Sequence, residues 1–327
     1  MATLRVGVIG AGYFGRHYVR LLHATKGIEL AGVAVRATTE MIDIPDDAVR
    51  YGSADELLQD QKIDCVVIVT PPSTHAELAV KALENGKHVL LEKPMALSIA
   101  EAHTIERAIK KSSRIFMVGH QYCYNDSVRE LKKEIEKGTL GEVKYVFAEH
   151  LYAGPVRLDV GCLWETATHE LSIIDYLFPN ARVTKISGQM LDMAGSGRDD
   201  LATAVLRFDT KMLATIFTTW FAPQKVRRMI IGGTQGMACF NEKEKNPLVF
   251  TRHPYPSGES PELHTSHFFE ITEKETYIPD IEAHEPLANQ LDHFFECIRE
   301  QKMPLTGIEQ GLRITKLLEE ITTGIWV

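Results

Sequence analysis

The sequence has few cysteines and no cysteine pair. Five are scattered over 327 residues without a C-x-x-C motif. An odd number of scattered thiols in a chain of this length indicates a reducing compartment and excludes a disulfide-framed secreted domain. No cleavable apolar leader precedes Leu4 and Arg5, which already belong to a short apolar strand. We therefore expect a cytoplasmic protein.

Long apolar runs and an excess of basic charge are also missing. No apolar stretch approaches the roughly 20 residues of a membrane helix, so we expect no membrane partner. Lys and Arg total 36 against 44 Asp and Glu, a formal net charge of -8. That sign argues against nucleic acid as a partner, because phosphate binding requires a basic surface. A hydrophobic content of 44% suffices for sizeable cores, and the length favours two domains.

Strands and helices alternate over residues 1–122. Apolar strands are expected at 5–9, 28–35, 65–69, 88–91 and 115–118, with helices between them. Ser53, Thr74 and Ser98 each precede a glutamate at capping-box spacing, and Gly86 stands where a helix should end in a left-handed residue. This alternation predicts βαβ units and an α/β domain with a doubly wound parallel sheet.

Strands dominate residues 123–327. After a helix expected at 126–137, strands are expected at 143–148, 183–190, 202–208, 212–220 and 228–231, interrupted by one helix at 163–177. Neighbouring strands of this kind indicate an antiparallel sheet and an α+β domain. Helices at 287–300 and 307–325 close the chain, and the Pro- and His-rich stretch 252–267 is expected to be an irregular loop or insertion.

A glycine motif follows the first strand. Gly10, Gly12 and Gly15 form G-x-G-x-x-G, with Tyr13 and Phe14 inside it, and the motif opens a helix. In this context the pattern is typical of dinucleotide binding, because the glycines permit a tight turn, a close approach of the pyrophosphate and close packing of helix on strand. The helix N-terminus offers free N–H groups to the phosphates. A purely structural glycine turn is the alternative.

The tip of the second strand bears on the choice of cofactor. A carboxylate there would bind the ribose 2′-hydroxyl of NAD, whereas an arginine accommodates the 2′-phosphate of NADP. This chain has Arg36, Thr38 and Thr39 and no carboxylate. The pattern favours NADP over NAD; the alternative is that Arg36 is a solvated surface residue.

Lys93 follows the strand expected at 88–91 and precedes Pro94. The carboxyl end of a parallel strand is where ligands bind in open α/β sheets, and a following proline restricts the backbone of Lys93. A lysine in isolation would carry little weight, since most lysines are solvated.

These residues resemble signatures of the Gfo/Idh/MocA family. The stretch 86–94, GKHVLLEKP, is similar to its lysine motif, and 70–77, TPPSTHAE, resembles its preceding cofactor loop. Segments 119–122 and 140–143, Pro286-Leu287 with His293-Phe294, and segment 304–306 are also similar, so the resemblance covers essentially the whole chain. It implies cofactor contacts from Thr70, Pro71, His75, Glu92 and Lys93.

The resemblance also has consequences for the fold. It implies an N-terminal Rossmann dinucleotide-binding domain, 1–122, and a substrate-binding and oligomerisation domain, 123–327, built on a large open-faced, mostly antiparallel sheet. The nicotinamide would lie at their junction, and the open sheet face would form a homodimer or homotetramer.

A histidine motif lies in the helix expected at 163–177. Glu165 and His169 are four residues apart and would share one helical face. A histidine beside a carboxylate suits proton exchange near neutral pH, which alcohol oxidation needs. Family members often carry D-x-G-x-H-x-x-D here; this chain has Glu165 and Ser172 at the aspartate positions and resembles a W-D-x-x-x-H subgroup, which leaves the substrate open.

The predicted chemistry is hydride transfer between NAD(P) and a secondary alcohol or ketone of a sugar, cyclitol or nucleotide-sugar. His169 would be the general acid/base; Lys93 would donate a hydrogen bond to the substrate oxygen or relay the proton; Glu165 would orient His169 or hold a neighbouring hydroxyl. Residues expected to line the substrate site are Asn125, Arg157, Trp164 and His169, with Trp164 either a sugar-stacking face or a core residue.

Two alternatives belong to other classes. An NAD-dependent glycosidase of the same fold would return its cofactor unchanged. A non-catalytic NAD(P)-sensing regulator would need no proton relay, so Lys93 with His169 argues against it. His253, His264 and His267 lack the matching ligand pattern of a metal site, and we predict no metal.

Overall fold

The computed structural model describes residues 3–35, 44–252 and 275–324. The chain forms two compact units. Unit 1 comprises Met1–Tyr124 and Glu285–Glu319, and unit 2 comprises Asn125–His284 and Glu320–Val327. The units differ from the predicted division at 122/123 in two respects: their first boundary lies at 124/125, and most of the last two helices belong to unit 1. The domains 1–122 and 123–327 stay a prediction.

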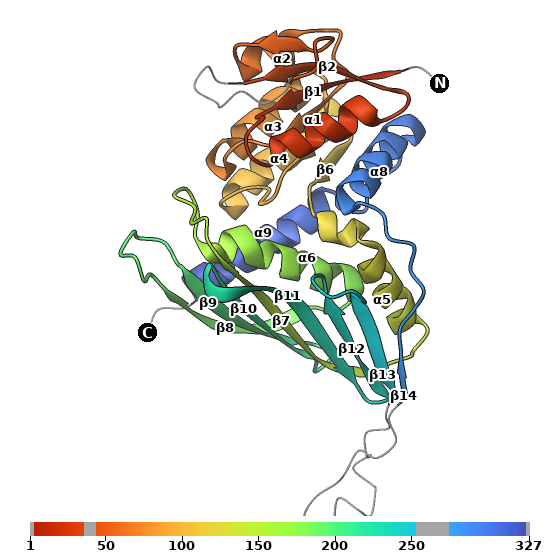
Figure 1. The fold of residues 1–327 in the computed structure, drawn as a ribbon. Helices are drawn as coiled ribbons and strands as arrows, with labels where there is room; N and C mark the ends of the chain where they lie inside the picture. The colour runs from red at the N-terminus through yellow and green to blue at the C-terminus, as the bar shows by residue number, and fades with distance from the viewer. Residues whose placement is uncertain (1–2, 36–43, 253–274, 325–327) are drawn as a thin grey trace, which may run out of the picture. The chain divides into compact units, whose positions relative to one another are not determined.

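Unit 1 contains a six-stranded parallel sheet in the order β3-β2-β1-β4-β5-β6, which confirms the predicted Rossmann class (Figure 1). Its strands are β1 (Leu4–Ile9), β2 (Ile28–Ala34), β3 (Val49–Tyr51), β4 (Cys65–Ile68), β5 (His88–Leu91) and β6 (Phe116–Val118). Its helices are α1 (Gly15–Ala24), α2 (Ala54–Gln59), α3 (His75–Glu84), α4 (Ile99–Ser112), α8 (Pro286–Glu300) and most of α9 (Ile308–Thr323).

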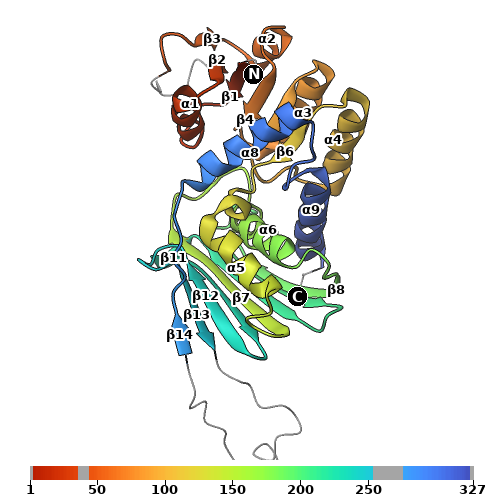
Figure 2. The same cartoon turned by 90° about the vertical axis from the view of Figure 1, so that its right-hand side faces the viewer.

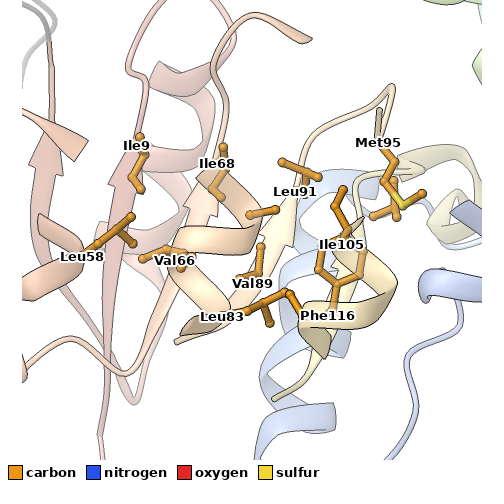
Figure 3. Close-up of a cluster of buried hydrophobic side chains, with 14 of the residues drawn as sticks. Ile9, Leu58, Val66, Ile68, Leu83, Val89, Leu91, Met95, Ile105 and Phe116 are labelled. Carbon is orange, nitrogen blue, oxygen red and sulfur yellow. The ribbon is translucent and has the colours of Figure 1, made fainter. Parts of the chain in front are cut away.

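Every side chain of β4 and β5 is buried, as the continuous apolar runs predicted. Figure 3 shows the resulting core on one side of the sheet, where Val66 and Val89 lie near Leu83 of α3, and Ile105 of α4 lies near Phe116. Burial of such side chains contributes about 1.5–3 kcal/mol each, so this core fixes the sheet that carries the loops described below.

Two predicted helix caps are confirmed. The hydroxyls of Ser53 and Ser98 each accept a hydrogen bond, at 3.2 Å, from the backbone N–H three residues later. Gly86 has φ +73°, the left-handed conformation expected after α3.

The predicted cap at Thr74 is wrong. Its hydroxyl donates to the Pro71 carbonyl oxygen at 2.8 Å and lies 2.7 Å from the Thr70 hydroxyl. The reason is that a 3₁₀ turn, Pro72–Thr74, leads directly into α3, so Thr74 has helical φ and ψ instead of the extended conformation of a capping residue.

Unit 2 contains an eight-stranded sheet in the order β14-β13-β12-β11-β7-β10-β9-β8, antiparallel except for the β7–β10 pair. The predicted α+β class is therefore confirmed. Its strands are β7 (Val143–Ala153), β8 (Val183–Leu191), β9 (Leu201–Phe208), β10 (Leu213–Thr219), β11 (Phe221–Gly233), β12 (Gly236–Asn241), β13 (Leu248–Arg252) and β14 (Glu275–Tyr277). The sequence had not indicated β12, β13, β14 or the short β3 of unit 1.

Two helices of unit 2, α5 (Asp126–Glu136) and α6 (Thr168–Leu177), cover one face of this sheet (Figure 2). Side chains of β9 and β10 alternate between buried and half-buried along each strand, because one face packs on the helices and the other does not. Among the described residues, no helix is long and apolar enough to cross a membrane.

Candidate active site

The glycines of the turn after β1 have different environments. Gly10 has φ +92°, and a Cβ placed on it would lie 2.5 Å from the Val69 carbonyl oxygen. A Cβ on Gly15 would overlap the Gly10 carbonyl oxygen, whereas a Cβ on Gly12 would meet nothing within 4 Å. The turn thus needs Gly10 for its backbone conformation and Gly15 for close packing, and it leaves open space at Gly12.

The start of α1 fits a bound phosphate group. Within the described residues, Phe14 at the N-cap makes no capping hydrogen bond through its side chain, and the first turn has no acidic residue. Arg16 and His17 donate from their backbone N–H groups to the Gly12 and Phe14 carbonyl oxygens at 3.2 and 3.0 Å, so what the helix start offers an anion is mainly the positive end of its dipole, with no carboxylate competing for it. Tyr13 is 79% exposed beside them. These are the features that the pyrophosphate of a dinucleotide requires.

His75 joins two loops at the same edge of the sheet. Its imidazole is fully buried, with Nδ1 2.8 Å from the Pro94 carbonyl oxygen and Nε2 2.9 Å from the Thr70 carbonyl oxygen. The ring therefore sets the spacing between the loop after β4 and the turn that contains Lys93. Direct contacts of His75, Thr70 and Pro71 with a cofactor stay predictions.

Glu92 is a buried carboxylate next to Lys93. Its Oε1 accepts a hydrogen bond from the Tyr18 hydroxyl at 2.5 Å, and its Oε2 accepts one from the Lys93 backbone N–H at 3.1 Å. Only 6% of Glu92 is exposed, while Lys93 is half-buried. The carboxylate thus holds the backbone at Lys93.

The parallel strands bring these segments to one sheet edge. Ile9 of β1 pairs with Ile68 of β4, and Ile68 pairs with Leu91 of β5. The residues that follow these strands, Gly10, Val69 and Glu92, are therefore neighbours at the carboxyl edge. That edge is where open α/β sheets bind nucleotides.

Unit 2 places His169 against a second histidine that the sequence analysis missed. The rings of His169 and His150 are stacked, with centroids 5.6 Å apart and an interplanar angle of 15°. His150 Nδ1 lies 2.9 Å from Glu170 Oε1, and all three side chains are buried. The available signal was the alternation along β7, which points His150 to the helix-covered face, and the position of Glu170 directly after His169.

Arg157 and Glu165, both predicted site residues, meet in an ionic network. Arg157 makes a bidentate pair with Asp159, at 2.8 and 2.6 Å, and donates from Nη1 to Glu165 Oε2 at 3.2 Å. The Arg157 guanidinium lowers the pKa of the Asp159 carboxyl. Burial, followed by the charge of Glu165, raises the pKa of Tyr152 to about 12, so Tyr152 keeps its proton beside this network.

The helix geometry at Glu165 differs from the prediction. Residues Leu163–Ala167 form a π-turn, and α6 begins at Thr168. In a π-turn the hydrogen bonds join residues five apart, so the single α-helix predicted at 163–177 is instead a π-turn followed by α6, and the shared face of Glu165 and His169 stays a prediction. The Glu170 carboxylate contacts His150, and the His150 ring stacks on that of His169. A role of Glu165 in orienting His169 stays a prediction.

Trp164 and Asn125 have structural contacts. The Trp164 indole N–H donates to the Thr322 hydroxyl at 3.1 Å, and the ring is half-buried. Asn125 caps α5, because its Oδ1 accepts from the backbone N–H groups of Ser127 and Val128 at 2.9 and 3.3 Å. Their proposed contacts with substrate remain untested.

Some predicted residues cannot be placed. Arg36 and the histidines His253, His264 and His267 lie outside the described residues. Within the described ranges, no group of three or more His, Cys, Asp or Glu side chains could hold a metal ion.

Comparison with protein families gives two matches. Residues 4–120 match a model described as an oxidoreductase family with an NAD-binding Rossmann fold, and residues 128–239 match a GFO/IDH/MocA C-terminal domain. The two models belong together in one family and meet near the boundary between the units.

Individual relatives are distant and match most of the chain. The scyllo-inositol 2-dehydrogenase (NAD(+)) of Bacillus subtilis is 28% identical, over 95% of this chain and 91% of its own length. The 2,7-anhydro-N-acetylneuraminate hydratase of Escherichia coli is 28% identical over 74% of this chain and 68% of its own. The fold matches UDP-N-acetylglucosamine 3-dehydrogenase GnnA of Acidithiobacillus ferrooxidans with a TM-score of 0.82 at 22% identity, over 99% and 98% of the two chains.

Proposed function

Because the chain belongs to the Gfo/Idh/MocA family of NAD(P)-dependent oxidoreductases, we propose that it transfers hydride between NAD(P) and a secondary alcohol or ketone of a sugar, cyclitol or nucleotide-sugar. The observation that carries the proposal is the carboxyl edge of the unit 1 sheet. The uncapped start of α1 and the turn of Glu92 and Lys93 lie at the ends of strands of one parallel sheet. Relatives named as inositol and nucleotide-sugar dehydrogenases support the substrate class.

The nicotinamide, when bound, would supply the hydride acceptor or donor. In this chain His169 takes the proton of the substrate hydroxyl as a general base, or returns it in reduction. His150, fixed by Glu170, supports the face of the His169 ring. Lys93 donates a hydrogen bond to the same substrate oxygen and stabilises its developing negative charge. Glu165 either orients His169 or, together with Arg157, to which it is hydrogen-bonded, holds a neighbouring hydroxyl.

The test is a screen of candidate substrates with NAD and with NADP, in which the absorbance of the reduced nicotinamide is the readout. Cyclitols such as scyllo-inositol, free aldoses and UDP-N-acetylglucosamine form the panel. We expect reduced cofactor to accumulate with at least one cyclitol or sugar. The alternative is a reaction without net oxidation or reduction of the substrate. One relative is named as a hydratase, and hydration is a reaction of this kind. Product without accumulated reduced cofactor would support that alternative, which also includes the NAD-dependent glycosidase.

The cofactor preference rests on Arg36. We propose NADP over NAD, because the sequence 35–39 that follows β2 contains Arg36 and no carboxylate. Arg36→Ala is expected to raise the Kd of NADPH by about tenfold, through loss of a charge-assisted bond to the 2′-phosphate, and to leave the Kd of NADH within about twofold. Titration of intrinsic fluorescence with each cofactor measures both constants. Equal changes for the two cofactors would refute the assignment.

The open face of the unit 2 sheet suits self-association. Its half-buried side chains include an apolar set from four strands: Phe147, Leu151, Val205, Phe217 and Met237. An apolar face of this kind is typical of a subunit interface. We therefore propose a homodimer or homotetramer, and light scattering after size exclusion is expected to give two or four times the chain mass of 36.7 kDa. A monomer mass at micromolar concentration would contradict this.

A further inference from the structure

We propose that Tyr18 and Gln290 are positioning residues for the turn formed by Glu92 and Lys93, and that they tune cofactor binding through the Glu92 carboxylate. The proposal rests on the proposed function, since it assumes that this turn faces a nicotinamide cofactor. Neither residue belongs to a motif that the sequence analysis singled out.

A chain of hydrogen bonds joins three elements of unit 1. Gln290 of α8 donates from Nε2 to the Tyr18 hydroxyl at 2.8 Å. Tyr18 of α1 donates to Glu92 Oε1 at 2.5 Å, and Glu92 Oε2 accepts from the Lys93 backbone N–H at 3.1 Å. Tyr18 and Gln290 are fully buried. Three segments far apart in sequence are therefore joined in one hydrogen-bond network.

The direction of this chain is fixed by chemistry. Burial, and next the charge of Glu92, raises the pKa of Tyr18 well above its usual range, so the hydroxyl keeps its proton. Its one proton goes to Glu92 Oε1, since a carboxylate oxygen carries no proton to donate in return. The Tyr18 oxygen can then accept from Gln290. Each member therefore orients the next toward Lys93.

Gln290 is difficult to explain as a packing residue. Its Oε1 is buried and accepts no hydrogen bond from the described residues. Burying an unsatisfied acceptor costs free energy, which an apolar side chain of the same size would avoid. The donation to Tyr18 is the contact that accounts for an amide at this position.

Two further contacts limit where Glu92 and Tyr18 can move. A Cβ on Gly119 would lie 2.9 Å from Glu92 Oε1, so the backbone bounds the carboxylate on that side. The Tyr18 ring packs edge-on against Phe14, with centroids 5.8 Å apart. Phe14 lies in the glycine turn, so Tyr18 connects the predicted phosphate-binding segment with the turn that contains Lys93.

The test compares two tyrosines in the full-length protein. Tyr18→Phe keeps the buried ring and removes the hydroxyl, so we expect the Kd of NADH and NADPH, from fluorescence titration, to rise about tenfold. Tyr124→Phe is the matched control: Tyr124 is also fully buried in unit 1, and its hydroxyl bonds to Thr306 at 3.0 Å. Tyr124→Phe should lower Tm about as much as Tyr18→Phe does, because each variant loses one buried hydroxyl. It should leave the Kd of NADH and of NADPH within about twofold of the values for the unmutated protein.

Gln290→Met removes the amide donor with little change in size. It should raise the Kd about threefold, and the double variant with Tyr18→Phe should match Tyr18→Phe, because Gln290 acts through Tyr18. Equal Kd values for Tyr18→Phe and Tyr124→Phe would overturn the proposal, as would simple additivity in the double variant. Failure of the unmutated protein to bind NADH or NADPH would instead refute the proposed function.

Discussion

Lys93→Met is expected to lower kcat by at least about 10²–10³ with any substrate found in the screen, while the Kd of NADH or NADPH stays within about an order of magnitude. The ammonium group stabilises charge that develops on the substrate oxygen, and methionine has similar length without a donor. Removing one such donor usually costs about 10²–10³ in kcat. The phosphates bind mainly to the turn Gly10–Gly15, so affinity for the cofactor should persist. Steady-state kinetics and fluorescence titration measure the two effects.

The control for this variant is Lys87→Met. Lys87 directly precedes β5, at the opposite end of the strand from Lys93, and its buried Nζ donates to the carbonyl oxygens of Asp60 and Ile63 at 2.7 and 2.8 Å. Loss of the Lys87 ammonium group removes the hydrogen-bond donor of both carbonyl oxygens. It should lower the free energy of unfolding by about 1–3 kcal/mol and leave kcat nearly unchanged. If Lys93→Met showed the same pattern, a loss of Tm with normal kcat, then Lys93 would be structural.

His169→Asn should lower kcat by about 10²–10⁴, the usual contribution of general acid/base catalysis. The limb of the pH–rate profile near neutrality should also disappear, because asparagine has no group that titrates there. Both effects follow from assigning the proton of the substrate hydroxyl to this imidazole. A variant with near-normal kcat and an unchanged limb would contradict the assignment.

A second buried histidine serves as the control. Burial lowers the pKa of His88 to about 4, so its imidazole is neutral throughout the neutral range. His88 accepts from the Ile115 backbone N–H at 2.9 Å and is not part of the proposed site. His88→Asn should therefore keep the limb and kcat. Loss of the limb in this variant would show that the titration does not report His169.

Glu165→Gln separates the two roles that remain open for this carboxylate. If Glu165 favours the charged form of His169, its neutral analogue should move the limb to lower pH with a small loss of rate. If it holds a substrate hydroxyl together with Arg157, KM should rise and the limb should stay. No change in either would mean that the carboxylate has no catalytic role.

Sequence patterns predicted much of the fold. Apolar runs and glycine positions depend on the local backbone conformation and burial. The parallel sheet and the turn at Gly10 were therefore predicted correctly. The prediction of a helix cap at Thr74 is wrong because the spacing of Thr74 and Glu77 does not distinguish a capping residue from one inside a 3₁₀ turn. The short strands β3 and β14 have three residues each, too few to show a period.

Long-range contacts were beyond prediction. Tyr18 and Gln290 are 272 residues apart, and nothing local in the sequence indicates that α8 contacts α1. The stacking of His150 on His169 likewise depends on which strand lies beneath α6. Periodicity tells which face of an element is buried, and not which distant element covers it.

The central claim is direct hydride transfer with net change of the cofactor. The measurement uses the polyol found in the screen, deuterated at the carbon that bears the reacting hydroxyl, and analyses the nicotinamide by NMR. The account predicts one equivalent of reduced cofactor per ketone, with deuterium at C4 of the nicotinamide ring. Product formed without net reduced cofactor, or hydrogen from solvent at C4, would contradict it.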